Sequence, residues 1–315
     1  MNMKRRTLLQ LASGLAAAQL DFGETPIPVI DAHTHFFDPR RPEGIVWPKK
    51  EMSFYRPVLP DEFIKLTKPF NVKGTVVVES SARMEDNDWA FTMAEKNPII
   101  VGYVGRLTPG TPDFPVLLEK YRKIPLFLGI RISFAIANTA MAQPQVLADL
   151  KLMANAGLQI DLGGAPNQLH LTLIQLAKIS DRIPNLRMVL NHLPMPRPEN
   201  KEDLELLKTG FEEMKHHLNI YVKLSQVIRT VNQSVPTDLE YWRDALDEVY
   251  AVFGPDRVIY GSNWPASLLT TEYPPVFNLV QKYFAGKGRE VSEKYFWKNS
   301  LKVYRWVKRD ASQPG

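Results

Sequence analysis

The chain has 315 residues, of which 44% are hydrophobic and 23% charged, with 17 Gly, 25 Pro and no Cys. This composition is that of an ordinary globular protein, and it excludes a disordered chain, a collagen and a disulfide-stapled scaffold. Lys and Arg number 39 against 34 Asp and Glu, which gives a formal net charge of +5. The length fits either two domains of about 150 residues each or one barrel of about 250 residues with appendages.

Much of the positive charge lies at the amino terminus. Three basic residues, Lys4–Arg6, precede an uncharged run, residues 8–18, that ends in three alanines, an order that resembles a twin-arginine export signal with a cleavage site. We therefore expect residues 1–18 to be a signal peptide and residues 19–315 to form a periplasmic or secreted domain. Without the three basic residues, 39 − 3 = 36 positive side chains face 34 negative ones, and the net charge is +2.

Nothing in this charge balance indicates a nucleic-acid-binding protein, because such proteins concentrate basic residues on one face. A membrane helix needs about 20 consecutive apolar residues, and no apolar run in the sequence is that long. The sequence therefore predicts a small-molecule substrate as the partner and no membrane span after processing, and it does not predict an oligomeric state.

Eight short apolar runs alternate with longer segments of helical period from Ile27 onward. Nearly continuous apolar runs are typical of strands that are covered on both faces of a parallel sheet. Eight such strands predict an α/β fold of the TIM (β/α)8 barrel type in a single domain, whereas a doubly wound open sheet usually has fewer strands and a Gly-rich first turn. The expected strands are Ile27–Ile30, Gly74–Val78, Ile99–Val104, Phe127–Ile132, Leu158–Leu162, Leu186–Leu190, Ile220–Leu224 and Arg257–Tyr260.

Six segments between these runs place apolar residues at intervals of three and four, which predicts helices. They are Asp88–Lys96, Asp113–Arg122, Pro144–Ala156, Pro166–Ser180, Lys201–Leu218 and Thr237–Phe253. Two stretches depart from the repeat. Residues 36–60 are rich in Pro and aromatics and predict an ordered lid over the barrel mouth. Residues 288–308 predict an amphipathic closing helix whose aromatic side chains serve packing.

Polar side chains stand at the carboxyl end of every expected strand, where barrels of this kind place their reactive groups. Because buried strands otherwise exclude charge, this pattern predicts one polar pocket. His33 and His35 lie two residues apart in an extended segment, so both imidazoles should face the same way. The pocket candidates are Asp31, His33, His35, Glu79, Arg106, Arg131, Asp161, Asn191, His192, Lys223, Ser225, Ser262, Asn263 and Trp264.

Four motifs, in this order, resemble the amidohydrolase superfamily: Asp31–His35, Gly129–Arg131, Asn191–His192 and Gly261–Pro265. More narrowly, they are similar to the amidohydrolase-2 branch, which includes sugar-lactone and pyrone-dicarboxylate lactonases. The resemblance spans the chain from about Pro28 to Val307. It implies a hydrolase that opens a small lactone by attack of water, plausibly the lactone of a sugar acid.

The resemblance also implies roles for individual residues. His33, His35 and His192 would be catalytic, polarising the lactone carbonyl or holding a divalent metal ion, and Arg131 would grip the substrate. Among the other pocket candidates, we predict substrate contacts for Glu79, Asp161, Arg106 and Trp264, in addition to Arg131.

Asn263 departs from the pattern of these lactonases, which have an aspartate there to take a proton from water. An amide cannot accept a proton as a carboxylate does. We expect Asn263 to orient a water or to donate to a developing oxyanion. The base would then be His192, Glu79 or Asp161, with His192 favoured because an imidazole titrates near neutral pH.

Metal dependence stays open at this stage. One zinc or manganese ion on His33, His35 and His192 would have three protein ligands and an open position for water. Two alternatives to a lactonase also remain. One is a metal-dependent decarboxylase or amide hydrolase on the same barrel, and the other is an inactive small-molecule binding protein, which the amide at position 263 would explain.

Overall fold

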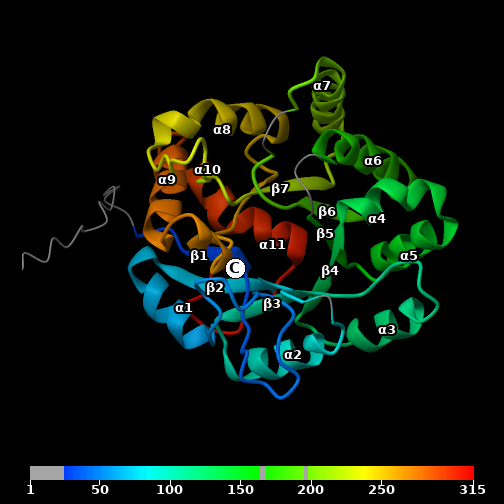
Figure 1. The fold of residues 1–315 in the computed structure, drawn as a ribbon, viewed down its shortest axis with the longest axis horizontal. Helices are drawn as coiled ribbons and strands as arrows, with labels where there is room; N and C mark the ends of the chain where they lie inside the picture. Colours follow the sequence, from blue (N-terminus) through cyan, green and yellow to red (C-terminus); the bar gives the residue numbers. More distant parts are fainter. Residues whose placement is uncertain (1–24, 82, 164–167, 195–197) are drawn as a thin grey trace, which may run out of the picture.

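The computed structural model describes residues 25–81, 83–163, 168–194 and 198–315. Eight parallel strands pair in sequential order from β1 to β8. A parallel bridge between Thr34 and Trp264 brings the two edges of the sheet together, so the barrel is nearly closed. Helices surround it (Figure 1). The predicted TIM barrel is therefore confirmed.

The strands recur close to where the apolar runs predicted them. β1 shows the largest difference, because it was expected to end at Ile30 and in fact reaches Thr34. His35, the residue after β1, is also bonded to the segment that follows β8, since its backbone N–H donates to the carbonyl of Trp264 (2.9 Å). The strands are β1 (Val29–Thr34), β2 (Val72–Val78), β3 (Ile100–Gly105), β4 (Phe127–Ser133), β5 (Gln159–Gly163), β6 (Arg187–Leu190), β7 (Ile220–Leu224) and β8 (Val258–Tyr260).

All six predicted helices are present, with ends shifted by a few residues. They are α2 (Asp86–Lys96), α3 (Phe114–Tyr121), α5 (Pro144–Asn155), α6 (Leu169–Arg182), α7 (Lys201–His216) and α8 (Leu239–Phe253). The expected helix start at Pro166 lies outside the described residues. Elements that the periodicity did not predict are α1 (Pro60–Thr67), η1 (Lys68–Phe70), α4 (Phe134–Thr139), η2 (Ala140–Ala142), η4 (Ala266–Leu269) and α9 (Tyr273–Ala285).

Two apolar layers hold the fold together. The larger layer fills the space between the barrel and its ring of helices. The smaller layer fills the barrel interior, where strand residues pack against the end of the chain. Its members include Ile30, Val76, Val101, Leu128, Val189, Ile259, Val303 and Trp306. The barrel is therefore a packed core and not a pore, as is usual for this fold.

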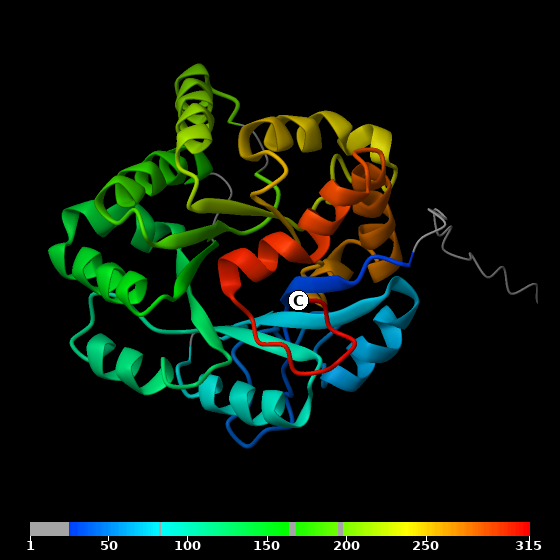
Figure 2. The ribbon, with the colours of Figure 1, turned by 180° about the vertical axis from the view of Figure 1, so that it is seen from behind.

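The carboxyl-terminal segment closes the end of the barrel at which the strands begin. We call this closed end of the barrel the floor. The expected closing helix is divided into α10 (Arg289–Glu293), a π-helical turn η5 (Lys294–Lys298) and α11 (Asn299–Tyr304). Seen from behind, this segment crosses the end of the barrel (Figure 2). Beyond it, the Gln313 amide donates to the carbonyls of Lys73 (3.0 Å) and Pro98 (2.9 Å), which fixes the chain end beside β2 and β3.

The predicted lid, residues 36–60, is ordered at the other end of the barrel. Its two arms form an antiparallel bridge between Phe37 and Val58, and Phe37 and Phe54 are buried. The ring of Trp47 lies 5.5 Å from that of His35. In the part of the chain that the structure describes, no helix combines the length and apolarity needed to cross a membrane.

Candidate active site

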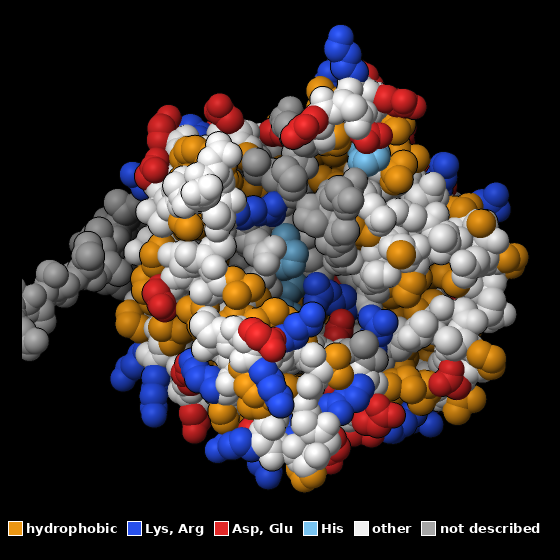
Figure 3. All heavy atoms as spheres, viewed as in Figure 1, with side chains coloured by type: hydrophobic (Ala, Val, Ile, Leu, Met, Phe, Trp, Pro, Cys, Tyr) orange, Lys and Arg blue, Asp and Glu red, His pale blue; other side chains and the backbone are white. Residues whose placement is uncertain are grey.

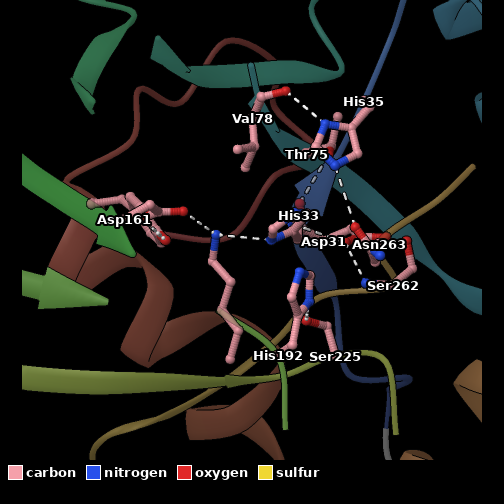
Figure 4. Close-up of polar contacts among 12 residues, drawn as sticks. Asp31, His33, His35, Thr75, Val78, Asp161, His192, Ser225, Ser262 and Asn263 are labelled. Carbon is pink, nitrogen blue, oxygen red and sulfur yellow. Dashed lines mark hydrogen bonds and ion pairs between the residues drawn. The ribbon is translucent and has the colours of Figure 1, made fainter. Parts of the chain in front are cut away.

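Three imidazoles meet at the carboxyl end of the barrel (Figure 4). His33 belongs to β1, His35 directly follows it, and His192 follows β6. The ring centroid of His33 lies 5.0 Å from that of His35 and 4.9 Å from that of His192. On the same face, a hollow near the centre shows histidine side chains at its bottom and Lys or Arg side chains beside it (Figure 3).

A register shift in β1 shapes this cluster. The pairing with β2 changes between Asp31 and Thr34, so β1 carries one extra residue there, a β-bulge of the kind that re-aims side chains near active sites. Asp31 stabilises the bulge, because its Oδ1 accepts the backbone N–H groups of His33 (3.1 Å) and Ser262 (2.9 Å). Burial raises the pKa of Asp31 to about 6. Gly261 is needed opposite, since a Cβ there would lie 2.8 Å from the His33 Cβ.

His35 is held in place at both ring nitrogens. Its Nδ1 lies 2.9 Å from the carbonyl oxygen of Val78, and its Nε2 lies 3.3 Å from the amide oxygen of Asn263. A carbonyl oxygen only accepts, so Nδ1 carries the single hydrogen of a neutral ring, and Nε2 then bonds Asn263 when the amide is turned to present its NH2 group. Burial, with the nearby charge of Arg131, lowers the pKa of His35 to about 3. His35 is therefore neutral at neutral pH.

His192 has a free nitrogen on the pocket side. Its Nδ1 pairs with the hydroxyl of Ser225 at 2.8 Å, and no described residue bonds to its Nε2. Burial and the charge of Arg131 hold the pKa of His192 well below its ordinary value. The backbone of His192 is left-handed (φ 72°), as is that of Asn263 (φ 58°), an uncommon conformation for residues with side chains.

Asp161 is not placed to bind a substrate, which corrects the sequence-based prediction. Its side chain is fully buried, and each of its oxygens has a protein partner. Lys223 Nζ donates to Oδ2 at 2.6 Å, and the hydroxyl of Tyr304 donates to Oδ1 at 2.8 Å. Lys223 Nζ also lies 3.4 Å from Nδ1 of His33. With both acceptors occupied by this network, Asp161 is equally unsuited to act as a base.

Lys223 and Tyr304 thus belong to the site although the sequence analysis assigned neither a role. Lys223 was noticed only as a polar residue at the end of a strand, and a lysine among four apolar or aromatic residues was the available signal. Tyr304 was attributed to packing together with the other aromatics of the closing segment. No local pattern distinguishes it, because its partner Asp161 is 143 residues away in sequence.

Arg131, Glu79 and Arg106 form a charged group on the β2–β4 side of the pocket. The Arg131 guanidinium lies flat against Gly163, where a Cβ would come within 2.7 Å of its terminal nitrogen. Among the described residues, none accepts a hydrogen bond from Arg131. Burial raises the pKa of Glu79, and the charges of Arg131 and Arg106 oppose that rise. Both arginines are therefore near enough to Glu79 for their charges to act on it.

A crevice opens beside Glu79, between the lid and α2. Trp47, which contacts His35, forms part of its wall together with Trp89. Trp264 does not line it, contrary to the expectation of a substrate contact. That indole is 1% exposed and packs beside Phe63, with ring centroids 5.5 Å apart, so its contribution is to the core.

The chain matches the family model described as Amidohydrolase over residues 30–306. It belongs to the amidohydrolase family. This confirms the resemblance carried by the motifs at the ends of β1, β4, β6 and β8, and it agrees with the barrel. The amidohydrolase is accordingly an enzyme of the hydrolase class.

Curated relatives of this amidohydrolase include two lactonases. L-fucono-1,5-lactonase of Burkholderia ambifaria is 27% identical over 247 residues, which cover 78% of this chain and 82% of the relative. L-rhamnono-gamma-lactonase of Scheffersomyces stipitis is 26% identical over 190 residues, covering 52% and 54%. The fold also matches a zinc-bound amidohydrolase of Burkholderia multivorans with a TM-score of 0.75 and 20% identity, covering 89% of this chain and 99% of that one.

The three imidazoles of this amidohydrolase do not fit the metal triad that the sequence left open. Both nitrogens of His35 have protein partners, and Nδ1 of His33 faces the ammonium of Lys223. Imidazole binds a metal through an unprotonated nitrogen, and the positive charge of Lys223 opposes a second cation at this place. Within the described ranges, no group of three or more His, Cys, Asp or Glu side chains is arranged to hold a metal ion.

Proposed function

We propose that this amidohydrolase opens a small lactone, the cyclic ester of a sugar acid, by attack of water on the ring carbonyl. Two lactonase relatives support the reaction class. The observation that carries the proposal is the pair of imidazoles of His33 and His192, whose centroids lie 4.9 Å apart. No described residue bonds to Nε2 of either ring, and the Nε2 of His33 is buried. A substrate that enters between the two rings would supply the missing partners.

His192 is the proposed general base. Its lowered pKa keeps the imidazole unprotonated at neutral pH, and its Nδ1 can donate to Ser225 so that Nε2 keeps a lone pair. Water attacks the carbonyl carbon as Nε2 takes its proton. The ester C–O bond of the tetrahedral intermediate then breaks, and the imidazolium returns the proton to the leaving alkoxide oxygen. The product is a hydroxy acid.

Positive and donor groups would stabilise the oxyanion of that intermediate. The charge of Arg131 acts on both His33 and His192, and preorganised donors in a water-poor site are usually the largest single contribution to catalysis. Arg131, with Glu79 and Arg106 beside it, would also hold the hydroxyl groups of the substrate. Asn263 contacts His35 and would position the attacking water.

This arrangement supports carbonyl activation by Arg131 and the imidazoles in place of the zinc or manganese ion considered from the sequence. The test is acid release by the purified protein on a panel of aldono-1,4- and 1,5-lactones, each with and without a chelator. We expect turnover of at least one lactone that chelation leaves unchanged. Loss of turnover on chelation would return a metal to His33 and His35, and failure on every lactone would reject the proposal.

Asn263→Asp separates an enzyme from an inactive binding protein. A carboxylate 3.3 Å from Nε2 of His35 would raise the pKa of His35 from about 3 and favour the imidazolium. A site adapted to the amide should lose activity on this change. An inert parent that gains activity would instead identify a protein that has lost turnover.

We further propose that the enzyme is exported in folded form, on the strength of the two arginines at positions 5 and 6 and the alanines that follow. Cell fractionation of the full chain tests this directly. Replacement of both arginines by lysine should retain the enzyme inside the cell, whereas unchanged fractionation would reject a twin-arginine route.

A further inference from the structure

The most unusual side chain of the barrel interior is that of Lys223. It lies in β7 among apolar residues and is 0% exposed. A buried ammonium is costly unless it is paired, and its pairing with Asp161 at 2.6 Å answers that need. A buried ion pair is nevertheless weak evidence for stability, since apolar residues of the same size often do as well. The pair therefore calls for an explanation in terms of function.

The second hydrogen-bond contact of Lys223, with His33, supplies such an explanation. Its Nζ lies 3.4 Å from Nδ1 of His33. An ammonium has three hydrogens to donate and no lone pair, so Nδ1 must be the acceptor and carry no hydrogen. A neutral imidazole has one ring hydrogen, which must then sit on Nε2. That nitrogen is buried and has no hydrogen-bond partner among the described residues.

The ammonium is itself immobilised from the floor of the barrel. Asp161 accepts from Lys223 through Oδ2 and from the Tyr304 hydroxyl, in α11, through Oδ1. The Tyr304 ring lies under the same ammonium, with Nζ 5.1 Å from its centroid. All three side chains are almost fully buried. A chain of contacts thus runs from the closing helix through Asp161 and Lys223 to His33.

We propose that Lys223 is a positioning residue that fixes His33 as the tautomer with hydrogen on Nε2. His33 then donates a hydrogen bond to the carbonyl oxygen of the substrate and can be neither the base nor a metal ligand. This inference rests on the proposed lactone hydrolysis for the identity of that oxygen. Two similar rings then have different roles. His33 donates a hydrogen bond through Nε2, whereas His192 pairs with a hydroxyl through Nδ1 and keeps a lone pair on Nε2 to accept a proton.

The direct test is nitrogen NMR of the full chain labelled with ¹⁵N-histidine, with His33 assigned through a His33→Gln variant. We expect Nδ1 of His33 to be unprotonated and Nε2 to carry hydrogen, without any substrate present. Hydrogen on Nδ1 of His33 in the unaltered protein would overturn the proposal.

The double variant Lys223→Met/Asp161→Asn supplies the second arm. Lys223→Met alone would leave a buried carboxylate without its partner and could prevent folding, whereas the double variant removes both charges and keeps an acceptor for Tyr304. We expect it to lose the fixed tautomer and to lower kcat by about 10²–10³-fold, the usual effect of removing one oxyanion donor, with a much smaller change in KM. Retention of the tautomer in this variant would overturn the proposal.

Lys294→Met is the matched control, because Lys294 also pairs with acidic side chains but lies on the surface. It should leave tautomer and kcat unchanged. The two arms also separate this inference from the proposed function. If no lactone is hydrolysed but His33 shows the expected, Lys223-dependent tautomer, the reaction assignment fails and the positioning role stands.

Discussion

The two ends of the barrel are built from the same eight strands and have opposite chemistry. At the carboxyl end, three imidazoles, Arg131 and Lys223 gather in one place. There the backbone is left-handed at His192, Gln226 and Asn263, and Nε2 of His33 has no described partner. At the floor, aliphatic side chains of the strands pack against Val303 and Trp306. The left-handed residues at that end, Asn71 and Arg305, are the C-caps of η1 and α11, where this conformation is common.

The difference shows where this molecule gains stability and where it gives stability up. Left-handed residues and unpaired buried polar atoms each cost free energy, and they cluster at functional sites when the surrounding structure holds them in place. Apolar burial at the floor contributes stability without chemical constraint. Changes at the mouth should therefore alter rate far more than stability, and changes to the apolar side chains of the floor should do the reverse.

His192→Asn should give the largest effect on rate. Asparagine tolerates a left-handed backbone, so the fold should be kept while the base is lost. We expect kcat for the best lactone to fall by about 10²–10⁴-fold with an unchanged urea midpoint. His170→Asn is the control, since His170 contacts Asp203 away from the site. A fall of less than tenfold would contradict the role of His192.

Trp306→Ala should give the largest effect on stability. The indole is 4% exposed and donates to the Ser300 hydroxyl at 3.1 Å. Truncation of a buried Trp typically costs about 3–5 kcal/mol, which urea unfolding would measure. We expect kcat of the folded variant to change less than threefold. Val116→Ala, at a 73% exposed position, should leave both quantities unchanged. If Trp306→Ala instead had normal stability and a low kcat, the proposed contrast between the mouth and the floor of the barrel would be wrong.

Gly163→Ala should act through the substrate anchor. The added Cβ would come within 2.9 Å of the Arg131 Nε, so the guanidinium must shift. Small displacements of a positioning group can cost up to about 10²-fold, and we expect KM to rise by roughly 10-fold. Gly286→Ala, whose added Cβ meets its neighbours at 3.4 Å or more, is the control. Equal effects from both variants would show that Arg131 is not involved.

The smallest effect should be that of mild acid. A base works when it is unprotonated, and the pKa of His192 lies well below its ordinary value. kcat/KM should therefore stay level from pH 8 through about pH 6.5, where an ordinary histidine would already be half protonated. A profile recorded from pH 8 to pH 5 would show this. An acid limb centred at or above pH 6.5 would mean that a different group, or an unshifted one, is the base.

Strand positions and the polar pocket could be predicted because both depend on local patterns. Apolar runs mark buried strands, and the residues after them meet at one end of the barrel. The predictions for Asp161 and Trp264 failed because a strand end shows only that a side chain is near the mouth. Whether that side chain faces the substrate depends on partners far away in sequence, here Tyr304 for Asp161 and Phe63 for Trp264.

The tautomers of the three histidines could not be predicted from the sequence either. His33, His35 and His192 look equivalent in the motifs, and the structure distinguishes them by what lies at Nδ1: an ammonium, a carbonyl and a hydroxyl. Of these partners, Lys223 and Ser225 gave a sequence signal, but only as polar residues at the end of an apolar run. The Val78 carbonyl belongs to the backbone and carries no signal at all.

The closing segment ties catalysis to the docking of a single helix. Tyr304 belongs to α11, far along the chain from His33, yet it fixes Asp161 and, through Lys223, His33. The network around His33 is therefore complete only once α11 has docked against the eight strands. A chain whose strands have paired but whose α11 is still undocked would lack the fixed imidazole, so activity should be the last property to return on refolding.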